Sequence, residues 1–220
     1  MDISKIGKPV SRRVYTGQAL RAVAMPMGGI GAGQIALCGD GSLRQWQIFN
    51  QVNHQAFVPN TFFAVWAKPG RDRPTCKVLQ TSVWYDETDF HPAPHISDHI
   101  VPEEVRRLLE RLPGVDDMEF IGEYPIAYLT YKDADLPVRV SLEAFSPFVP
   151  LNPKNSGLPA IVFIFNVKNI SELPVKVALA ASLQNAVGWD GVSPTVGVEN
   201  VRYGGNRNTV VRLKGLTAID

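Results

Sequence analysis

A glycine-rich stretch near the N-terminus is the first candidate for chemistry in this sequence. Residues 25–51, MPMGGIGAGQIALCGDGSLRQWQIFNQ, contain six glycines, and GAGQIA at 31–36 is a weak match to the G-x-G-x-x-A dinucleotide-binding fingerprint. That fingerprint needs a helix whose N-terminal amides point at the pyrophosphate, but a Gly-Asp-Gly turn signal begins at Gly39. The spacing instead predicts a strand over 34–38, a turn, and a strand over 43–49, which disfavours a nucleotide site.

Three histidines recur every four residues in HPAPHISDH, at His91, His95 and His99. On a helix they would share one face and form a ligand set that zinc favours. Pro92 and Pro94 prevent such a helix, because proline lacks the amide hydrogen and clashes with the preceding turn. We therefore expect an exposed loop here, with no metal site and no cofactor.

Paired carboxylates are the groups that hydrolyse glycosides, and they stand about 5 Å apart, or farther with a water between them. The acidic candidates are sequence neighbours in two loops: Asp86, Glu87, Asp89, Asp116 and Asp117. Neighbouring acids in a loop are usually solvated charge. The sequence has no Gly-x-Ser-x-Gly motif either, so we expect no catalytic residue in this chain.

Composition narrows the class of protein. The chain has 220 residues, 45% of them hydrophobic, with 22 basic and 21 acidic residues and no basic cluster, which predicts a globular protein without a nucleic-acid footprint. The first 25 residues lack an apolar run long enough for a signal peptide or a transmembrane segment, so we expect a cytoplasmic protein. With only two cysteines, Cys38 and Cys76, a disulfide framework is not expected, and both are predicted to be small core residues. The sequon at Asn169 is interpreted as a turn.

The sequence predicts strands over most of the chain. Apolar and polar residues alternate over 138–144, which pairs naturally with 127–131 as a hairpin, and the continuously apolar run 160–167 predicts a central strand covered on both faces. Further strands are expected at 62–68, 76–82, 175–183 and 209–215. Many strands without alternating helices predict an all-β antiparallel sandwich. Apolar residues at helical spacing predict one short surface helix over 102–112.

Two long blocks carry a resemblance to a known family. YTGQALRAVAMPMGGIGAG (15–33), followed by GDGSLRQWQIFN (39–50), is similar to the opening of glycoside hydrolase family 116, which includes non-lysosomal glucosylceramidases and bacterial β-glucosidases. The block 136–169, with its Ser-Pro-Phe, Leu-Asn-Pro and Leu-Pro-Ala elements, resembles the N-terminal domain of the same family, and NTFFAVWAKP (60–69) also fits.

The resemblance implies a supersandwich-like β-sandwich that packs against a C-terminal (α/α)6 barrel. In the family that barrel carries the glutamate nucleophile and the aspartate acid/base of a retaining β-glucosidase, and no residue of this chain matches either position. We therefore expect residues 1–220 to be an N-terminal β-sandwich domain, incomplete at its C-terminus and inactive alone, which supports the barrel and borders its active site. Glucosides would be bound only through the barrel, in carbohydrate metabolism.

An alternative reading is a stand-alone carbohydrate-binding sandwich. Its stacking platforms would be tryptophans. The candidates are Trp46, Trp66, Trp84 and Trp189.

Eight residues are our candidates for the barrel interface or the rim of its sugar pocket. They are Gly28, Gly29, Gly31, Gly33, Arg44, Trp46, Phe148 and Asn152. For the glycines the alternative is a structural role in tight turns and close backbone approaches. For the proline-rich loop 146–157 the alternatives are a plain crossover between sheets, or Phe148 and Leu151 inserted into an apolar groove of the barrel. An open sheet edge would also let the isolated chain self-associate.

Overall fold

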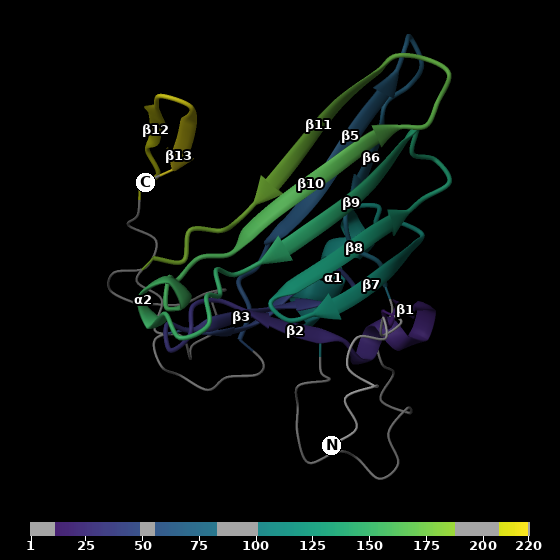
Figure 1. The fold of residues 1–220 in the computed structure, drawn as a ribbon. Coiled ribbons are helices and arrows are strands. Elements are labelled where there is room, and N and C mark those ends of the chain that lie inside the picture. Colours follow the sequence, from purple (N-terminus) through teal and green to yellow (C-terminus); the bar gives the residue numbers. More distant parts are fainter. Residues whose placement is uncertain (1–11, 49–55, 83–100, 188–206, 220) are drawn as a thin grey trace, which may run out of the picture.

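The computed structural model describes residues 12–48, 56–82, 101–187 and 207–219, and within them strands dominate (Figure 1). The largest sheet has five antiparallel strands in the order β1-β7-β8-β9-β10. Its strands are β1 (Tyr15–Thr16), β7 (Asp117–Glu123), β8 (Ile126–Lys132), β9 (Val138–Phe145) and β10 (Val162–Asn169). The predicted hairpin is confirmed, since β8 pairs with β9.

Two three-stranded sheets accompany it. One has the order β11-β5-β6, and the other is the meander β2-β3-β4. Their strands are β5 (Phe62–Pro69), β6 (Thr75–Val78), β11 (Val175–Ser182), β2 (Ala24–Met27), β3 (Gln34–Cys38) and β4 (Leu43–Gln47). A separate hairpin joins β12 (Val210–Leu213) to β13 (Leu216–Ile219).

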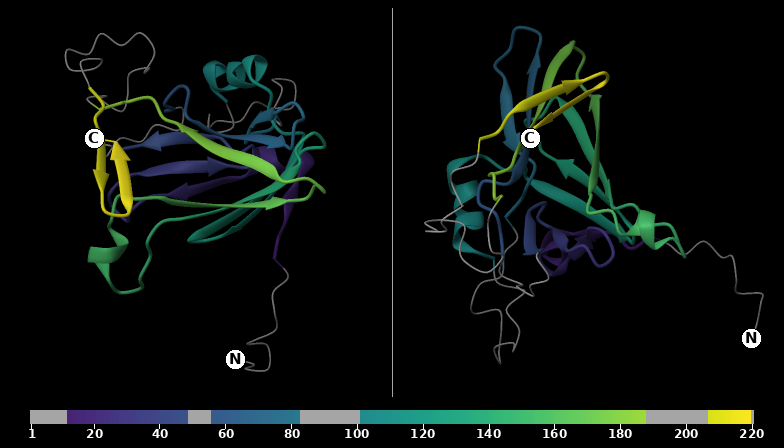
Figure 2. Two further views of the ribbon diagram at one scale, coloured as in Figure 1. Left: turned by 90° about the horizontal axis from the view of Figure 1, so that it is seen from above. Right: turned by 90° about the vertical axis from the view of Figure 1, so that its left-hand side faces the viewer.

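The core lies between the five-stranded sheet and the β5 sheet. Figure 2 shows these two sheets as the arms of a wedge, with the β2–β4 meander across one end. Alternate residues of β7, β8 and β9 point into the wedge, where Phe120, Leu129 and Val140 are fully buried. From the opposite sheet Phe63 meets Phe163 and Phe165 with ring centroids 4.9 and 5.0 Å apart. The predicted all-β sandwich is therefore confirmed.

Helices are short and peripheral in the described residues. They are the 3-10 helix η2 (Gly17–Ala22), α1 (Glu103–Arg111) and α2 (Pro153–Ser156). Helix α1 confirms the helix predicted over 102–112, and it buries Leu108. Among the described residues, no helix has the length and apolar character that a membrane crossing would need.

The β3–β4 hairpin explains the Gly-Asp-Gly sequence. Gly41 adopts φ +83°, and a Cβ on Gly39 would lie 2.1 Å from the Leu20 carbonyl oxygen. One Asp40 carboxylate oxygen accepts hydrogen bonds from the Ser42 amide and hydroxyl. The glycines therefore serve a turn between strands and no helix begins at them, as the spacing predicted.

Two expectations are wrong. The run 160–167 was predicted to be a central strand, yet β10 ends the five-stranded sheet and its outward-facing Val162 and Ile164 are 37% and 43% exposed. An apolar run shows that a strand packs on a core. It does not show that the strand has a neighbouring strand on both edges or that both of its faces are covered. Cys76 is exposed, because β6 turns it away from the core, whereas Cys38 is buried as predicted.

Several candidates fall outside the described residues. These are His91, His95, His99, Asp86, Glu87, Asp89, Trp84 and Trp189. At the sequon, the Asn169 carboxamide oxygen accepts from the Ser171 amide, which is the turn that was predicted.

Candidate functional site

Two loops far apart in the sequence are joined at one end of the sandwich. Loop 28–33 connects β2 to β3, and residues 146–158 belong to the connection from β9 to β10. The Ile30 amide donates to the Ser156 carbonyl oxygen at 2.8 Å. The Gly28 amide donates to Ser146 Oγ at 2.7 Å. The bonds from Gly28 and Ile30 fix the position of loop 28–33 relative to the second loop.

The glycines permit this close contact. A Cβ on Gly29 would lie 2.4 Å from the Leu158 carbonyl oxygen and 2.6 Å from that of Gly157. A Cβ on Gly28 would lie 2.2 Å from the Gly33 carbonyl oxygen, and Gly28 and Gly33 both have positive φ. Since a real Cβ cannot approach backbone this closely, side chains here would separate the loops.

The second loop is stiffened from within. Asn152 precedes α2, and its side-chain oxygen accepts from the Asn155 amide at 3.0 Å, which is a helix N-cap. Ser156 Oγ accepts from the Val149 amide and donates to the Val149 carbonyl oxygen. These local bonds hold a loop that prolines already restrict.

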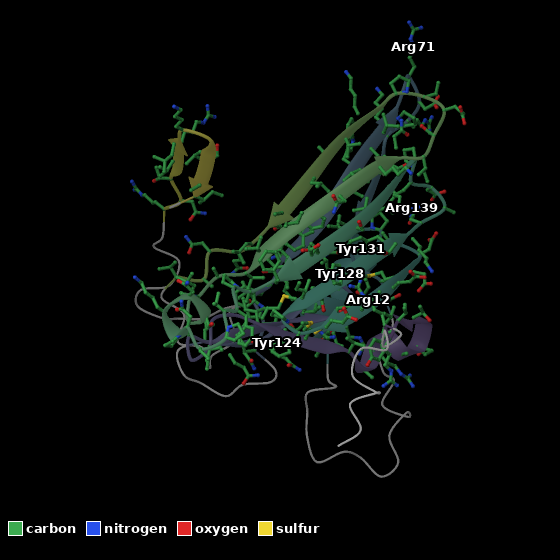
Figure 3. All side chains as sticks on the ribbon, viewed as in Figure 1. Arg12, Arg71, Tyr124, Tyr128, Tyr131 and Arg139 are labelled. Atoms are coloured by element: carbon green, nitrogen blue, oxygen red, sulfur yellow. The ribbon has the colours of Figure 1, made fainter. Side chains whose placement is uncertain are left out.

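The joined loops, together with Tyr124 of the turn between β7 and β8, expose a cluster of apolar side chains, which we call the loop platform. It consists of Ile30, Tyr124, Phe148, Val149, Leu151 and Leu158. Leu151 is fully exposed and has φ +62°, a backbone conformation unusual for leucine. Tyr124 meets Phe148 edge to face, with centroids 5.5 Å apart. Figure 3 places Tyr124 at the α2 end of the molecule, and Arg71 and Arg139 toward the other end.

The two joined loops are nearly free of charge. Lys154 is the one charged residue in the sequence of the two loops, 28–33 and 146–158. A rigid, uncharged and exposed apolar surface is typical of a protein interface, because covering it removes apolar area from water at little cost in conformational entropy.

Arg44 lies inside the domain. Its guanidinium is 3.5 Å from the Asp40 carboxylate, and both side chains are at least nine-tenths buried. Burial is the largest single influence and would lower the pKa of Arg44, but the interactions with Asp40 and Cys38 together outweigh it and the pKa is raised. Burial also raises the pKa of the neighbouring Cys38 thiol to about 11, so the thiol stays protonated at neutral pH. This cluster holds the β3–β4 hairpin together.

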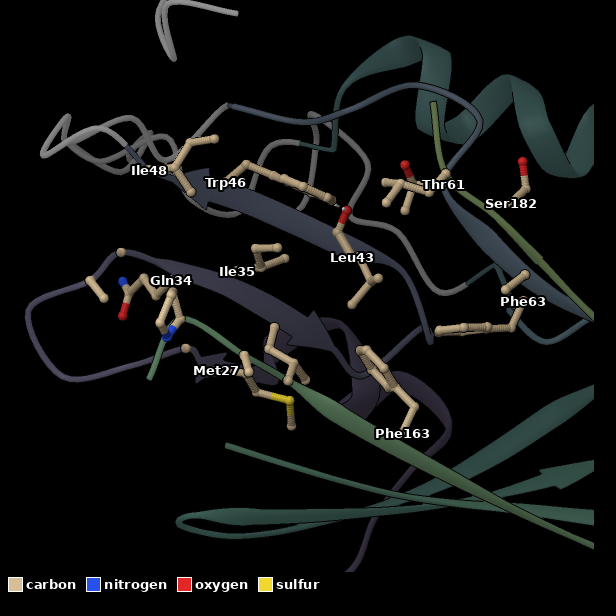
Figure 4. Close-up of a pocket in the computed structure, with 18 residues that line it drawn as sticks. Met27, Gln34, Ile35, Leu43, Trp46, Ile48, Thr61, Phe63, Phe163 and Ser182 are labelled. Atoms are coloured by element: carbon tan, nitrogen blue, oxygen red, sulfur yellow. Dashed lines mark hydrogen bonds between the residues drawn. The ribbon is translucent and has the colours of Figure 1, made fainter. Parts of the chain in front are cut away.

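Trp46 is buried too, and it lines an apolar cavity of about 440 Å³ (Figure 4). Its indole nitrogen donates to the Leu43 carbonyl oxygen at 3.2 Å. Apolar side chains make up most of the lining, among them Met27, Ile35, Leu43, Phe63 and Phe163. Because its indole is buried, Trp46 cannot serve as an exposed stacking platform for sugars. Trp66, the other described candidate, is half-buried on β5.

In the part of the chain that the structure describes, no group of three or more His, Cys, Asp or Glu side chains could hold a metal ion. Asp116 accepts from the Ala134 amide at 2.9 Å, so it stabilises the turn before β9.

The structure thus brings together six of the eight candidate residues. The glycines of loop 28–33, Phe148 and Asn152 lie in the joined loops, whereas Arg44 and Trp46 are buried in β4. Sequence reasoning missed Ile30 and Ser156, which make the central contact between the loops. The isoleucine among the glycines could have indicated this contact, since residues that only form a turn are seldom apolar.

Comparison with known protein families gives one match that spans nearly the whole chain. The sequence model described as beta-glucosidase 2, glycosyl-hydrolase family 116 N-term, matches residues 24–218. The match includes both joined loops, the β5 sheet, strands β7 to β10 of the larger sheet and all but the last residue of the β12–β13 hairpin. The chain therefore belongs to glycosyl-hydrolase family 116 and matches the N-terminal domain of that family.

Proposed function

We propose that this chain is the accessory domain of a retaining β-glucosidase or glucosylceramidase, and that it docks on the catalytic (α/α)6 domain through the loop platform. The chain would supply shape and stability, while the catalytic domain supplies the nucleophile and the acid/base. Glucosides would then be hydrolysed only by the two domains together. Membership in the family supports the general role, and the platform carries the specific proposal.

The conformation of Leu151 is the strongest argument for docking. A leucine at φ +62° lowers the stability of the domain. Burial within the domain does not offset this cost, since the Leu151 side chain is fully exposed. Strained residues persist where surrounding contacts hold them, and they gather at functional surfaces. A pocket on the catalytic domain that buries Leu151 would gain about 2 kcal/mol from its apolar area.

The same contact would place the glycine loop beside the catalytic domain. Ile30 and Phe148 extend the platform from Leu151 toward loop 28–33. A loop held by backbone bonds to a rigid sandwich can border a sugar pocket without changing shape when substrate binds. The proposed border therefore consists of backbone and apolar side chains rather than of catalytic groups.

The test is Leu151→Asp in the complete enzyme, with Ile170→Asp as the matched control. Ile170 is 53% exposed and lies in the turn between β10 and β11, at the opposite end of the sheets. We expect Leu151→Asp to lower the Tm of the complete enzyme. Its kcat/KM should fall about tenfold, since a loss of about 1.4 kcal/mol corresponds to a factor of ten. Equal effects of the two substitutions, or no effect of either, would contradict docking through the platform.

The isolated chain provides a second control. Aspartate tolerates positive φ better than leucine, so Leu151→Asp should leave the stability of the isolated chain unchanged or slightly higher. A loss of stability in the isolated chain would assign Leu151 to the domain's own packing instead.

We also propose that the protein works in the cytoplasm. Both cysteines of the chain are free thiols, which suits a reducing compartment. Fractionation of cells that produce the complete protein tests this, and recovery in a secreted fraction would refute it.

A further inference from the structure

One flank of the sandwich is open. Strands β10 and β11 follow each other in the chain, yet they belong to different sheets, and each is the last strand of its sheet in the described part of the chain. Each pairs along its whole length with one neighbour, β10 with β9 and β11 with β5. Their other edges present unpaired backbone groups along the gap between the arms of the wedge (Figures 1 and 2).

The interior of the wedge reaches the surface at this gap. Val177 and Leu179 of β11 are opposite Ala67 and Val65, which are fully buried, so these β11 side chains are on the core face of the sheet. They are nevertheless 39% and 44% exposed. Core-facing side chains with this exposure lack a neighbouring strand to cover them.

The β12–β13 hairpin also exposes apolar side chains. Val210 and Leu213 of β12 are 60% and 61% exposed, and Ile219 of β13 is 73% exposed. A two-stranded hairpin alone in water is marginally stable at best. Figure 1 shows this hairpin (yellow) apart from both sheets, although the family match includes it in the same domain.

The hairpin is tethered beside the open flank. The Asn185 side-chain amide donates to the Asn208 side-chain oxygen, which joins the segment that leaves β11 to the segment that enters β12. The register of the hairpin puts Val211 opposite Ala218, so Val211, Leu213 and Ala218 lie on one face. Arg212 and Thr217 lie on the other face. Val210 and Ile219 share that second face, so the face with Val211, Leu213 and Ala218 is apolar and the second face is mixed.

We infer that the β12–β13 hairpin closes the sandwich by adding β12 to the free edge of β11. Strands that are consecutive in sequence commonly pair, and the free edge of β11 supplies the hydrogen-bonding groups. In this arrangement Val211 and Leu213 cover Val177 and Leu179, while Arg212 stays in water. The open edge is then a docking site within the chain rather than a site for a second copy.

Hydrogen exchange measured by mass spectrometry on the 220-residue chain tests this inference. We expect the amides of β12 and β13 to exchange at least tenfold more slowly than those of a free peptide of the same sequence. Leu213→Asp should abolish that protection and speed exchange in β11, whereas the control Arg212→Asp should leave both unchanged. Protection of β8 and β9 in both variants would show that the rest of the domain remains folded.

Two results would overturn the inference. One is exchange of the hairpin amides at the free-peptide rate in the unsubstituted chain. The other is protection that rises with protein concentration together with a dimer in light scattering, which would assign the β11 edge to a second copy of the chain.

Discussion

Replacing Gly29 with alanine should separate the two loops of the platform. The new Cβ would lie 2.4 Å from the Leu158 carbonyl oxygen, whereas ordinary contact begins at 3.4 Å, so the backbones must move apart by about 1 Å. That movement stretches the 2.8 Å hydrogen bond from the Ile30 amide to the Ser156 carbonyl oxygen. Gly29 does not have a positive φ, so crowding rather than backbone conformation opposes the alanine.

The magnitude follows from these two losses. Overpacking costs about 1–3 kcal/mol, and a weakened backbone hydrogen bond adds about 1 kcal/mol. We therefore expect Gly29→Ala to lower the free energy of unfolding by about 2–4 kcal/mol. Gly31→Ala is the matched control: its Cβ would meet nothing within 4 Å, and its φ of +73° alone sets the penalty, about 1 kcal/mol.

Urea unfolding of the isolated chain measures both values, and hydrogen exchange of the Ile30 amide, which donates to the Ser156 carbonyl oxygen, reports the loop contact directly. Gly29→Ala should speed exchange there, and Gly31→Ala should not. Equal stability losses for the two variants, or a loss below about 0.5 kcal/mol for Gly29→Ala, would refute the close contact between the loops.

Three further predictions concern the buried cluster of the β3–β4 hairpin and the two thiols. Arg44→Met leaves the buried Asp40 carboxylate without its cation and should lower the free energy of unfolding by about 3–5 kcal/mol; the double variant with Asp40→Asn should recover part of this loss in urea unfolding. Iodoacetamide at pH 8 should label the exposed Cys76 and leave the buried Cys38 unlabelled, as read by peptide mass spectrometry, and equal labelling would contradict the assigned burial. The pKa of Cys38 rises from 9.0 unfolded to about 11 folded, so its contribution to stability is complete below pH 9 and is lost as pH rises through 11. The decrease in unfolding free energy between pH 8 and pH 11 should therefore be smaller in Cys38→Ala, and an identical decrease would refute the shift.

Local pattern was sufficient to predict the strands that form the sandwich. Residues 138–144 alternate because one face of β9 packs on the core, and two aspartates mark the turn before it. The turn at Gly39 was predictable for a similar reason, since a helix cannot run through Gly-Asp-Gly. In each case the determining interactions lie within a few residues.

Contacts between distant residues were not predictable in this way. Gly29 must be glycine because of Gly157 and Leu158, which are far away in the sequence. The edge position of β10 depends likewise on which strands of the domain lie beside it, and the apolar residues of β10 do not determine those neighbours. Arg44 shows a third kind of failure, because a charged side chain on a strand is expected at the surface and this one is buried beside Asp40.

A β-glucosidase assay separates an accessory role of this chain from a catalytic one. A chromogenic β-glucoside is offered to the purified 220-residue chain and to the protein that carries this chain together with its catalytic domain. We expect no turnover by the chain alone and clear turnover by the two-domain protein. Turnover by the chain alone, or an inactive two-domain protein, would contradict its assignment as the accessory domain of a glycosidase.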